Sequence, residues 1–217
     1  MTRVKICGIS EKAHALGATS AGSDFIGLVF APSKRQVTPA QAQEIVETVK
    51  ENSETTETVG VFVNMPAPAV NKIARLCNLD WVQLSGDETW AYCQQIEKPI
   101  IKAIRIRAGE SIAEILDYLA SGDEALTGKD HRYLIDSRVE GAYGGTGVTA
   151  DWPVAQEIAR EFSIIIAGGL TPENVASAIK TVTPWGVDVS SGVETNGIKS
   201  TVKIKAFIDT VRRLDDS

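Results

Sequence analysis

Polar side chains close most of the apolar, β-branched segments of this sequence. Cys7 ends the segment RVKIC, Gln83 lies near the end of DWVQL, Asp136 ends RYLID, and Asp188 lies near the end of GVDVS. Side chains two residues apart on a strand share a face, so Lys5 and Cys7 are expected to point the same way, with Lys5 beneath Cys7. A thiol, carboxyls, an amide and an amine therefore lie at or near the ends of these segments.

The three cysteines indicate which chemistry sulfur can supply. Cys7, Cys77 and Cys93 are odd in number, widely separated and without a C-x-x-C pair, which favours neither a disulfide framework nor a zinc site. Cys77 and Cys93 fall at apolar positions of helical segments and are interpreted as packing residues. Chemistry at Cys7 must involve a free thiol.

Glycine-containing segments follow the last three strand candidates. They are GGTG at 144–147, AGGL at 167–170 and SSG at 190–192. Glycine allows backbone amides to approach an anion closely, although it also serves in ordinary turns. The later two segments predict a phosphate site, and hence a phosphorylated substrate.

The elements that must position these residues alternate regularly between strand and helix patterns. Eight short β-branched runs are each followed by a helical pattern, and the clearest helical patterns lie at 39–51, 66–77, 111–120, 153–162 and 172–181. The predicted strands are 3–7, 24–30, 58–64, 80–84, 99–106, 132–136, 163–167 and 186–190.

Eight β-α units predict a closed (β/α)8 TIM barrel, with residues 1–217 as a single domain. A doubly wound sheet usually has five or six strands, so the surplus argues against it. In such barrels the active site lies at the carboxyl ends of the strands, and phosphate often binds after strands seven and eight.

Composition and charge exclude several classes of function. Twenty-two Lys and Arg residues against 28 Asp and Glu give a net charge of −6, and no basic block is present to bind nucleic acid. The longest apolar runs are far shorter than a membrane-spanning helix, and the start of the chain has no secretory h-region. We therefore expect a cytoplasmic protein with no nucleic-acid or membrane partner; the sequence leaves monomer and homodimer both open.

Several strings together resemble one enzyme family. They are KICGI at 5–9, GLVFAPSKRQV at 27–37, GVFVN at 60–64, VQL at 82–84, the DS of 136–137 followed by GGTG, AGGLTPENV at 167–175 and GVDVSSGVE at 186–194. Their combination, from the first strand to the last, resembles the phosphoribosylanthranilate isomerases of tryptophan biosynthesis. The resemblance implies a (β/α)8 barrel that converts N-(5-phosphoribosyl)anthranilate into 1-(2-carboxyphenylamino)-1-deoxyribulose 5-phosphate by an Amadori rearrangement, without a metal or organic cofactor.

The resemblance also implies roles for individual residues. Cys7 matches the general base that takes the proton from C2′, Asp136 matches the general acid that protonates the ring oxygen, and Arg35 matches the residue that pairs with the anthranilate carboxylate. Lys5, Gln83 and Asp188 are expected to contact substrate or organise the site. The candidates for phosphate binding are Gly145, Gly147, Gly168, Gly169, Ser190 and Ser191.

These roles require Cys7 to lose its proton and Asp136 to keep its proton near neutral pH, which is the reverse of their ordinary behaviour. A thiol with an ordinary pKa of about 8.5 is mostly protonated at neutral pH, so we expect the pKa of Cys7 to be lowered, with Lys5 and the backbone amides after the first strand stabilising the thiolate. Asp136 must instead hold its proton to act as the acid.

One departure from the family pattern lies within the site. Strand four of the family often ends VQLHG, whereas this chain has VQLSG, so Ser85 stands where an imidazole is common.

Two alternatives remain open. One is a different sugar-phosphate barrel, such as indole-glycerol phosphate synthase or the bifunctional histidine–tryptophan isomerase; Cys7 argues against both. The other is a non-catalytic barrel that binds a phosphorylated metabolite.

Overall fold

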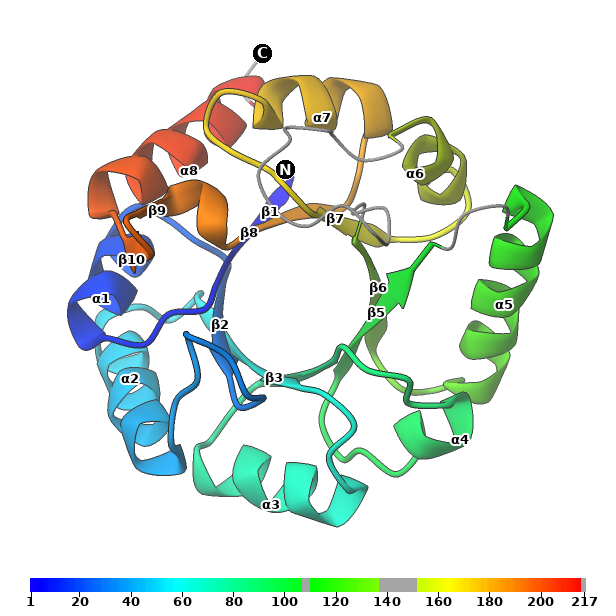
Figure 1. The fold of residues 1–217 in the computed structure, drawn as a ribbon, viewed down its shortest axis with the longest axis horizontal. Helices are drawn as coiled ribbons and strands as arrows, with labels where there is room; N and C mark the ends of the chain where they lie inside the picture. Colours follow the sequence, from blue (N-terminus) through cyan, green and yellow to red (C-terminus); the bar gives the residue numbers. More distant parts are fainter. Residues whose placement is uncertain (107–109, 137–151, 216–217) are drawn as a thin grey trace.

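The architecture is a closed barrel of eight parallel strands surrounded by helices (Figure 1). The structure, a computed structural model, describes residues 1–106, 110–136 and 152–215. The sheet closes because β1 pairs in parallel with both β2 and β8. The strands are β1 (Arg3–Cys7), β2 (Phe25–Val29), β3 (Glu57–Phe62), β4 (Trp81–Leu84), β5 (Ile100–Arg105), β6 (His131–Asp136), β7 (Ile164–Ala167) and β8 (Gly186–Val189). The predicted (β/α)8 barrel and all eight predicted strands are confirmed.

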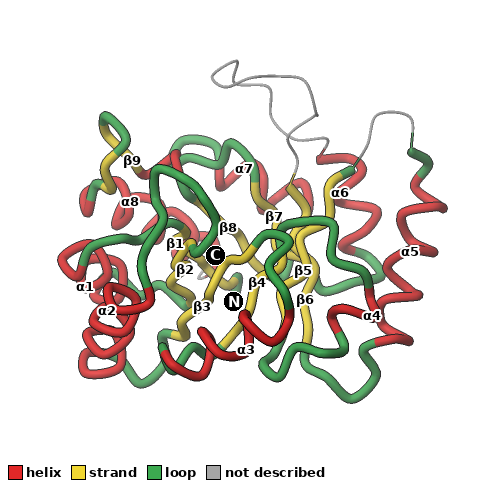
Figure 2. The backbone as a smooth tube through the Cα atoms, turned by 60° about the horizontal axis from the view of Figure 1, so that its bottom comes forward, coloured by secondary structure: helices red, strands yellow, loops and turns green. Residues whose placement is uncertain are grey.

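Helices follow the strands and lie outside them, as the side view shows (Figure 2). Two begin with capping boxes, in which Thr38 exchanges hydrogen bonds with Gln41 and Ser111 with Glu114. None of the helices in the described part of the chain is long and apolar enough to cross a membrane. They are α1 (Lys12–Ser20), α2 (Pro39–Asn52), α3 (Ala67–Leu76), α4 (Trp90–Cys93), α5 (Ile112–Ala125), α6 (Trp152–Ala159), α7 (Val175–Val182) and α8 (Thr201–Asp215).

The segment between β8 and α8 contains elements that the sequence analysis did not predict. A 3₁₀ turn, η1 (Ser191–Val193), leads into a small antiparallel hairpin of β9 (Glu194–Thr195) and β10 (Ile198–Lys199). Asn196 and Gly197 form its two-residue turn, with φ of 53° and 80°. Positive φ at both turn residues matches the turn geometry that two-residue hairpins favour.

Side chains alternate between the two faces of each strand, so the barrel has one apolar layer outside the strands and another inside them. Outward-facing side chains such as Val4 and Ile6 pack with the helices in the larger core. Inward-facing side chains fill the barrel with a second cluster that includes Phe25, Trp81 and Leu134. Two residues further along, the inward side chains of several strands become polar at the carboxyl end of the barrel. The apolar interior therefore serves as the floor of a polar cavity.

Candidate active site

A cavity of about 170 Å³ lies at the carboxyl ends of the strands. It is lined by groups from β1, β4, β5, β6, β7 and β8 and from the loops that follow them. The polar or glycine residues that line it are Cys7, Gln83, Ser85, Arg105, Asp136, Gly168, Gly169, Asp188, Ser190, Ser191 and Gly192. Gly145 and Gly147 lie outside the described residues.

Cys7 and Asp136 face this cavity from the ends of β1 and β6. Cys7 is 8% exposed. Asp136 is partly buried, and its backbone is in register with Arg105 on β5 and Ala167 on β7. A thiol and a carboxyl from two non-adjacent strands thus meet one enclosed space, as proton transfer at two atoms of a bound molecule requires.

Lys5 lies beneath Cys7 and does not line the cavity. Its ammonium is buried, donates to Asp188 Oδ1 at 3.0 Å and interacts electrostatically with Cys7. Burial alone lowers the pKa of Lys5, but Asp188 and Cys7 outweigh it and the pKa is raised. Gly27 on β2 leaves room for this contact, because a Cβ there would lie 3.0 Å from Cys7 Sγ and 3.2 Å from Lys5 Nζ.

The expected lowering of the pKa of Cys7 is wrong, because the pKa is raised. Burial raises the pKa of the thiol, Lys5 opposes that rise, and Asp188 adds to it. The amides after β1 do not help, because Gly8 N and Ile9 N both donate to the carbonyl of Gly27, at 2.9 and 3.0 Å. Desolvation therefore outweighs the ammonium.

Gln83 offers the cavity an unused buried acceptor. Its Nε2 donates to Ser85 Oγ at 3.0 Å, whereas its Oε1 has no hydrogen-bond partner among the described residues. Gln83 is only 5% exposed. Because an unsatisfied buried polar atom is costly, this oxygen is suited to accept a hydrogen bond from a ligand hydroxyl or a water.

The loops after β7 and β8 pack together at the rim of the cavity. Gly168 and Gly169 have φ of 93° and 68°, and Asn174 Nδ2 braces their turn by donating to Gly169 O at 3.0 Å. A Cβ on Gly192 would overlap the carbonyl of Leu170, so this glycine permits the close approach of the two loops. The predicted phosphate residues of these loops are thus brought together on one side of the cavity.

Arg35 lies next to the site but not in the lining of the cavity. Its Nε and Nη2 donate to the two carboxylate oxygens of Glu194 at 2.6 and 2.8 Å. Glu194 also accepts from Lys199 Nζ at 2.7 Å, and Lys199 donates to Ser190 O at 2.9 Å. This ion cluster connects the loop after β2 with the loop after β8.

Three charged residues of this region were not predicted. Glu194 and Lys199 form the ion cluster with Arg35, and Arg105 lines the cavity. Arg105 Nη2 donates to Ser85 O at 2.9 Å, so a cation from β5 stands at the end of β4, where the family often has an imidazole. The Asn196-Gly197 dipeptide was a usable signal for the hairpin that carries Glu194 and Lys199.

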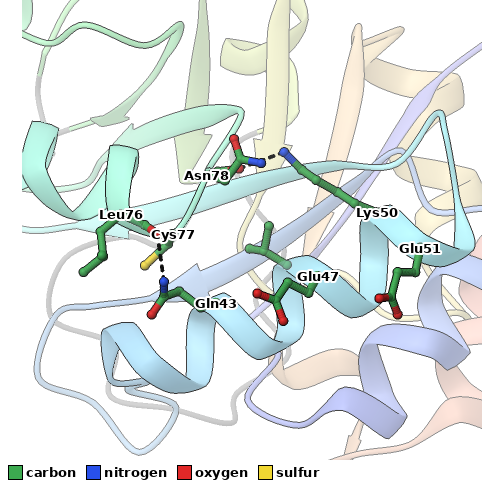
Figure 3. A pocket seen from close by; sticks show the side chains of 8 residues that line it. Gln43, Glu47, Lys50, Glu51, Leu76, Cys77 and Asn78 are labelled. Atoms are coloured by element: carbon green, nitrogen blue, oxygen red, sulfur yellow. Dashed lines mark hydrogen bonds between the residues drawn. The ribbon is translucent and has the colours of Figure 1, made fainter.

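A larger cavity of about 350 Å³ lies far from these groups, in the groove between α2 and α3 (Figure 3). Its polar side chains bond to nearby backbone: Gln43 Nε2 donates to Leu76 O at 3.1 Å and Lys50 Nζ to Asn78 O at 2.8 Å. Cys77 has a pKa raised by burial. This groove also holds carboxylates and the Cys77 thiol, but it lies between two helices outside the barrel and not at the carboxyl ends of the strands, where the active sites of such barrels lie.

Comparison with known proteins agrees with the resemblance. The family model for N-(5′-phosphoribosyl)anthranilate isomerase matches residues 4–210. An N-(5′-phosphoribosyl)anthranilate isomerase from a Roseiflexus species is 48% identical and covers 98% of each chain. The crystal structure of the Thermotoga maritima phosphoribosyl anthranilate isomerase superposes with a TM-score of 0.84 at 36% identity, over 98% of this chain and 100% of that one.

A related crystal structure contains a ligand. It is a phosphoribosyl anthranilate isomerase in complex with reduced 1-(o-carboxyphenylamino)-1-deoxyribulose 5-phosphate, with a TM-score of 0.81 at 34% identity over 98% of this chain and 100% of that one. The match of the family model over nearly the whole chain, together with these relatives, shows that the chain belongs to the N-(5′-phosphoribosyl)anthranilate isomerase family.

Proposed function

We propose that this chain isomerises N-(5′-phosphoribosyl)anthranilate to 1-(2-carboxyphenylamino)-1-deoxyribulose 5-phosphate, with Asp136 as general acid and Cys7 as general base. The observation that carries the proposal is that these two groups line one cavity from β6 and β1. Membership of the isomerase family supports the reaction class. We place the reaction in the cytoplasm, as the sequence analysis expects.

The chemistry begins with opening of the sugar ring. Asp136 gives its proton to the ring oxygen as the bond from that oxygen to C1′ breaks, and the anthranilate nitrogen lone pair forms a C1′=N double bond. This protonated Schiff base withdraws electrons and makes the neighbouring C2′–H acidic. No bond at phosphorus or in the aromatic ring changes in this step.

Proton abstraction completes the rearrangement. Cys7 reacts as its thiolate, the minor form at neutral pH because its pKa is raised, and takes the proton from C2′. The electron pair left behind forms a C1′=C2′ double bond as the nitrogen becomes neutral. The resulting enolamine tautomerises, gaining a proton at C1′ and losing one from the C2′ hydroxyl, which gives the ketone. One acid and one base suffice for proton balance.

The surrounding residues suit binding of this substrate. The paired loops of Gly168–Gly169 and Ser190–Ser191 present backbone near the cavity, as phosphate recognition in this fold requires. The unpaired Oε1 of Gln83 fits a sugar hydroxyl. Arg35 would pair with the anthranilate carboxylate, for which a guanidinium fork is well shaped. Lys5 and Asp188 would act through Cys7, because their charged groups bond to each other.

The test of the acid is Asp136→Asn. We expect this variant not to rescue a tryptophan auxotroph that lacks the isomerase, and the purified protein to lose about 10²–10⁴-fold in kcat because an amide cannot donate the required proton in this way. Asp130→Asn, at the exposed turn before β6, is the matched control and should rescue growth. Rescue by Asp136→Asn at normal expression would show that Asp136 is not the acid.

A further inference from the structure

Glu194 is a carboxylate enclosed by two cations beside the cavity. Its side chain is 6% exposed. It accepts from Arg35 Nε at 2.6 Å, Arg35 Nη2 at 2.8 Å and Lys199 Nζ at 2.7 Å. Burial raises the pKa of Glu194, but the hydrogen bonds from Arg35 and Lys199 outweigh it, and the pKa is lowered. The carboxylate is therefore charged at neutral pH.

The backbone of a small hairpin holds Glu194 in place. The β9–β10 hairpin sets Glu194 opposite Lys199 across its two-residue turn. Lys199 Nζ then reaches Ser190 O at 2.9 Å, so the hairpin is also bonded to the loop after β8. Glu194 is consequently part of a preformed unit that includes the candidate phosphate loop.

Glu194 occupies one side of the Arg35 guanidinium and leaves its end open. A guanidinium carries five N–H donors in one plane. Glu194 takes donors from Nε and Nη2, and among the described residues Nη1 has no hydrogen-bond partner. The end formed by Nη1 and Nη2 can therefore receive a second carboxylate in the two-pronged geometry that arginine favours.

The charge of the cluster remains positive. Arg35 and Lys199 contribute two positive charges and Glu194 one negative charge, which leaves +1. A neutral Arg–Glu pair would attract an anion weakly, so Lys199 preserves the attraction while Glu194 fixes the geometry. The alkyl part of Arg35 is also confined, because a Cβ on Gly8 would overlap Arg35 Cδ. Arg35 is held between the turn after Cys7 and Glu194.

We propose that Glu194 is a positioning residue for the isomerase: it fixes the Arg35 fork so that the free end of the guanidinium meets the substrate carboxylate. This inference rests on the role of Arg35 in the proposed function. Glu194 itself does not touch the substrate. It acts by removing rotamer freedom from Arg35 before the substrate arrives, which lowers the entropic cost of binding.

A double-mutant cycle on phosphoribosylanthranilate turnover tests the proposal, with KM and kcat measured for the wild type, Arg35→Met, Glu194→Gln and the double variant. We expect Glu194→Gln to raise KM about tenfold with little change in kcat, the pattern of lost binding that is uniform between ground and transition states. In the Arg35→Met background, Glu194→Gln should change KM less than about twofold, because residues that act through one contact are not additive.

Two further variants keep the test decisive. Glu194→Asp retains a charge beside Lys199 but shortens the reach to Arg35, so it should fold and still raise KM. Glu97→Gln removes the partner of Arg75 in an exposed pair far from the cavity and should leave KM and kcat unchanged.

The outcomes separate the inference from the proposed function. If Arg35→Met leaves KM unchanged, the proposed role of Arg35 is wrong. If Arg35→Met raises KM but Glu194→Asp and Glu194→Gln do not, the positioning role of Glu194 is wrong. Equal effects of Glu194→Gln with and without Arg35, or an effect confined to kcat, would also overturn it.

Discussion

Lys5 and Asp188 act on the proton affinity of Cys7 in opposite directions. The buried ammonium favours the thiolate and the carboxylate disfavours it, and both lie next to a thiol whose pKa burial already raises. Because Lys5 bonds to Asp188, neither charge reaches Cys7 unopposed. The raised pKa therefore keeps Cys7 mainly as the thiol at neutral pH.

Removing the charge of Lys5 and removing that of Asp188 should shift the pKa of Cys7 in opposite directions. Lys5→Met should raise the pKa of Cys7 and move the rise of kcat/KM with pH to higher pH, whereas Asp188→Asn should lower the pKa and move that rise to lower pH. Each unit of increase cuts the thiolate fraction at pH 7 about tenfold. The pKa is read from the pH dependence of iodoacetamide alkylation in a background where Cys77 and Cys93 are serine. Shifts of the same sign in both variants would contradict this account.

At the scale of elements, the strands were predictable and the ion cluster was not. Each strand is bounded by turn residues, and in β4, β5 and β6 the inward side chains change from apolar to polar, as from Trp81 to Gln83 or Leu134 to Asp136. That local pattern predicted where the chemistry lies. The pair of Arg35 with Glu194 joins residues 159 positions apart, and no local pattern encodes such a contact.

The degree to which Cys7 is buried is a second property that the sequence did not predict. The spacing of Lys5 and Cys7 correctly predicted that the ammonium lies beneath the thiol. It did not predict the sign of the thiol's pKa shift, because that sign depends on how completely β1, β2 and β8 enclose the group. Desolvation is a property of the assembled barrel.

Gly27 on β2 packs against two residues of the site, Cys7 and Lys5. Ala at this position would place its Cβ 3.0 Å from Cys7 Sγ, 3.1 Å from Cys7 Cα and 3.2 Å from Lys5 Nζ, so Cys7 and Lys5 would have to shift. We expect Gly27→Ala to lower kcat/KM about tenfold, because Cys7 at the reacting centre would be displaced. Its loss in melting temperature should be smaller than that of Gly60→Ala, whose Cβ would lie only 2.5 Å from Leu79 Cδ1. Steady-state kinetics and thermal unfolding measure the two effects.

Gly60→Ala on β3 is the matched control. Its Cβ would crowd Leu79 and Phe62 in the outer apolar layer, away from the cavity. This variant should lose melting temperature and keep kcat. A loss of kcat in Gly60→Ala equal to that in Gly27→Ala would mean that general loosening of the barrel explains both.

For the whole molecule, two apolar layers support a charged rim. The layer between strands and helices and the smaller cluster inside the barrel hold the strand ends in a closed ring. On that ring the ion cluster of Arg35, Glu194 and Lys199 bonds the loop after β2 to the loop after β8. The cluster should therefore contribute to stability as well as to binding.

The pH dependence of that contribution follows from the lowered pKa of Glu194. A carboxyl whose pKa is lower in the folded state stabilises the fold above its unfolded pKa and loses this effect as the pH falls through its folded pKa. The wild type should melt at a higher temperature than Glu194→Gln at pH 7, and the difference should shrink below about pH 4.5. A difference that stays constant or grows on acidification would contradict the ion-cluster account.

The central claim is that Cys7 removes the C2′ proton, and Cys7→Ser tests it most directly. The measurement is single-turnover loss of phosphoribosylanthranilate fluorescence, alongside the Kd of reduced 1-(o-carboxyphenylamino)-1-deoxyribulose 5-phosphate as a binding probe. We predict that Cys7→Ser lowers the rate constant about 10²–10⁴-fold and leaves Kd within about threefold of the wild type, because a serine hydroxyl fills the site but is a far weaker base. A rate constant equal to that of the wild type would contradict the assignment of Cys7 as the base.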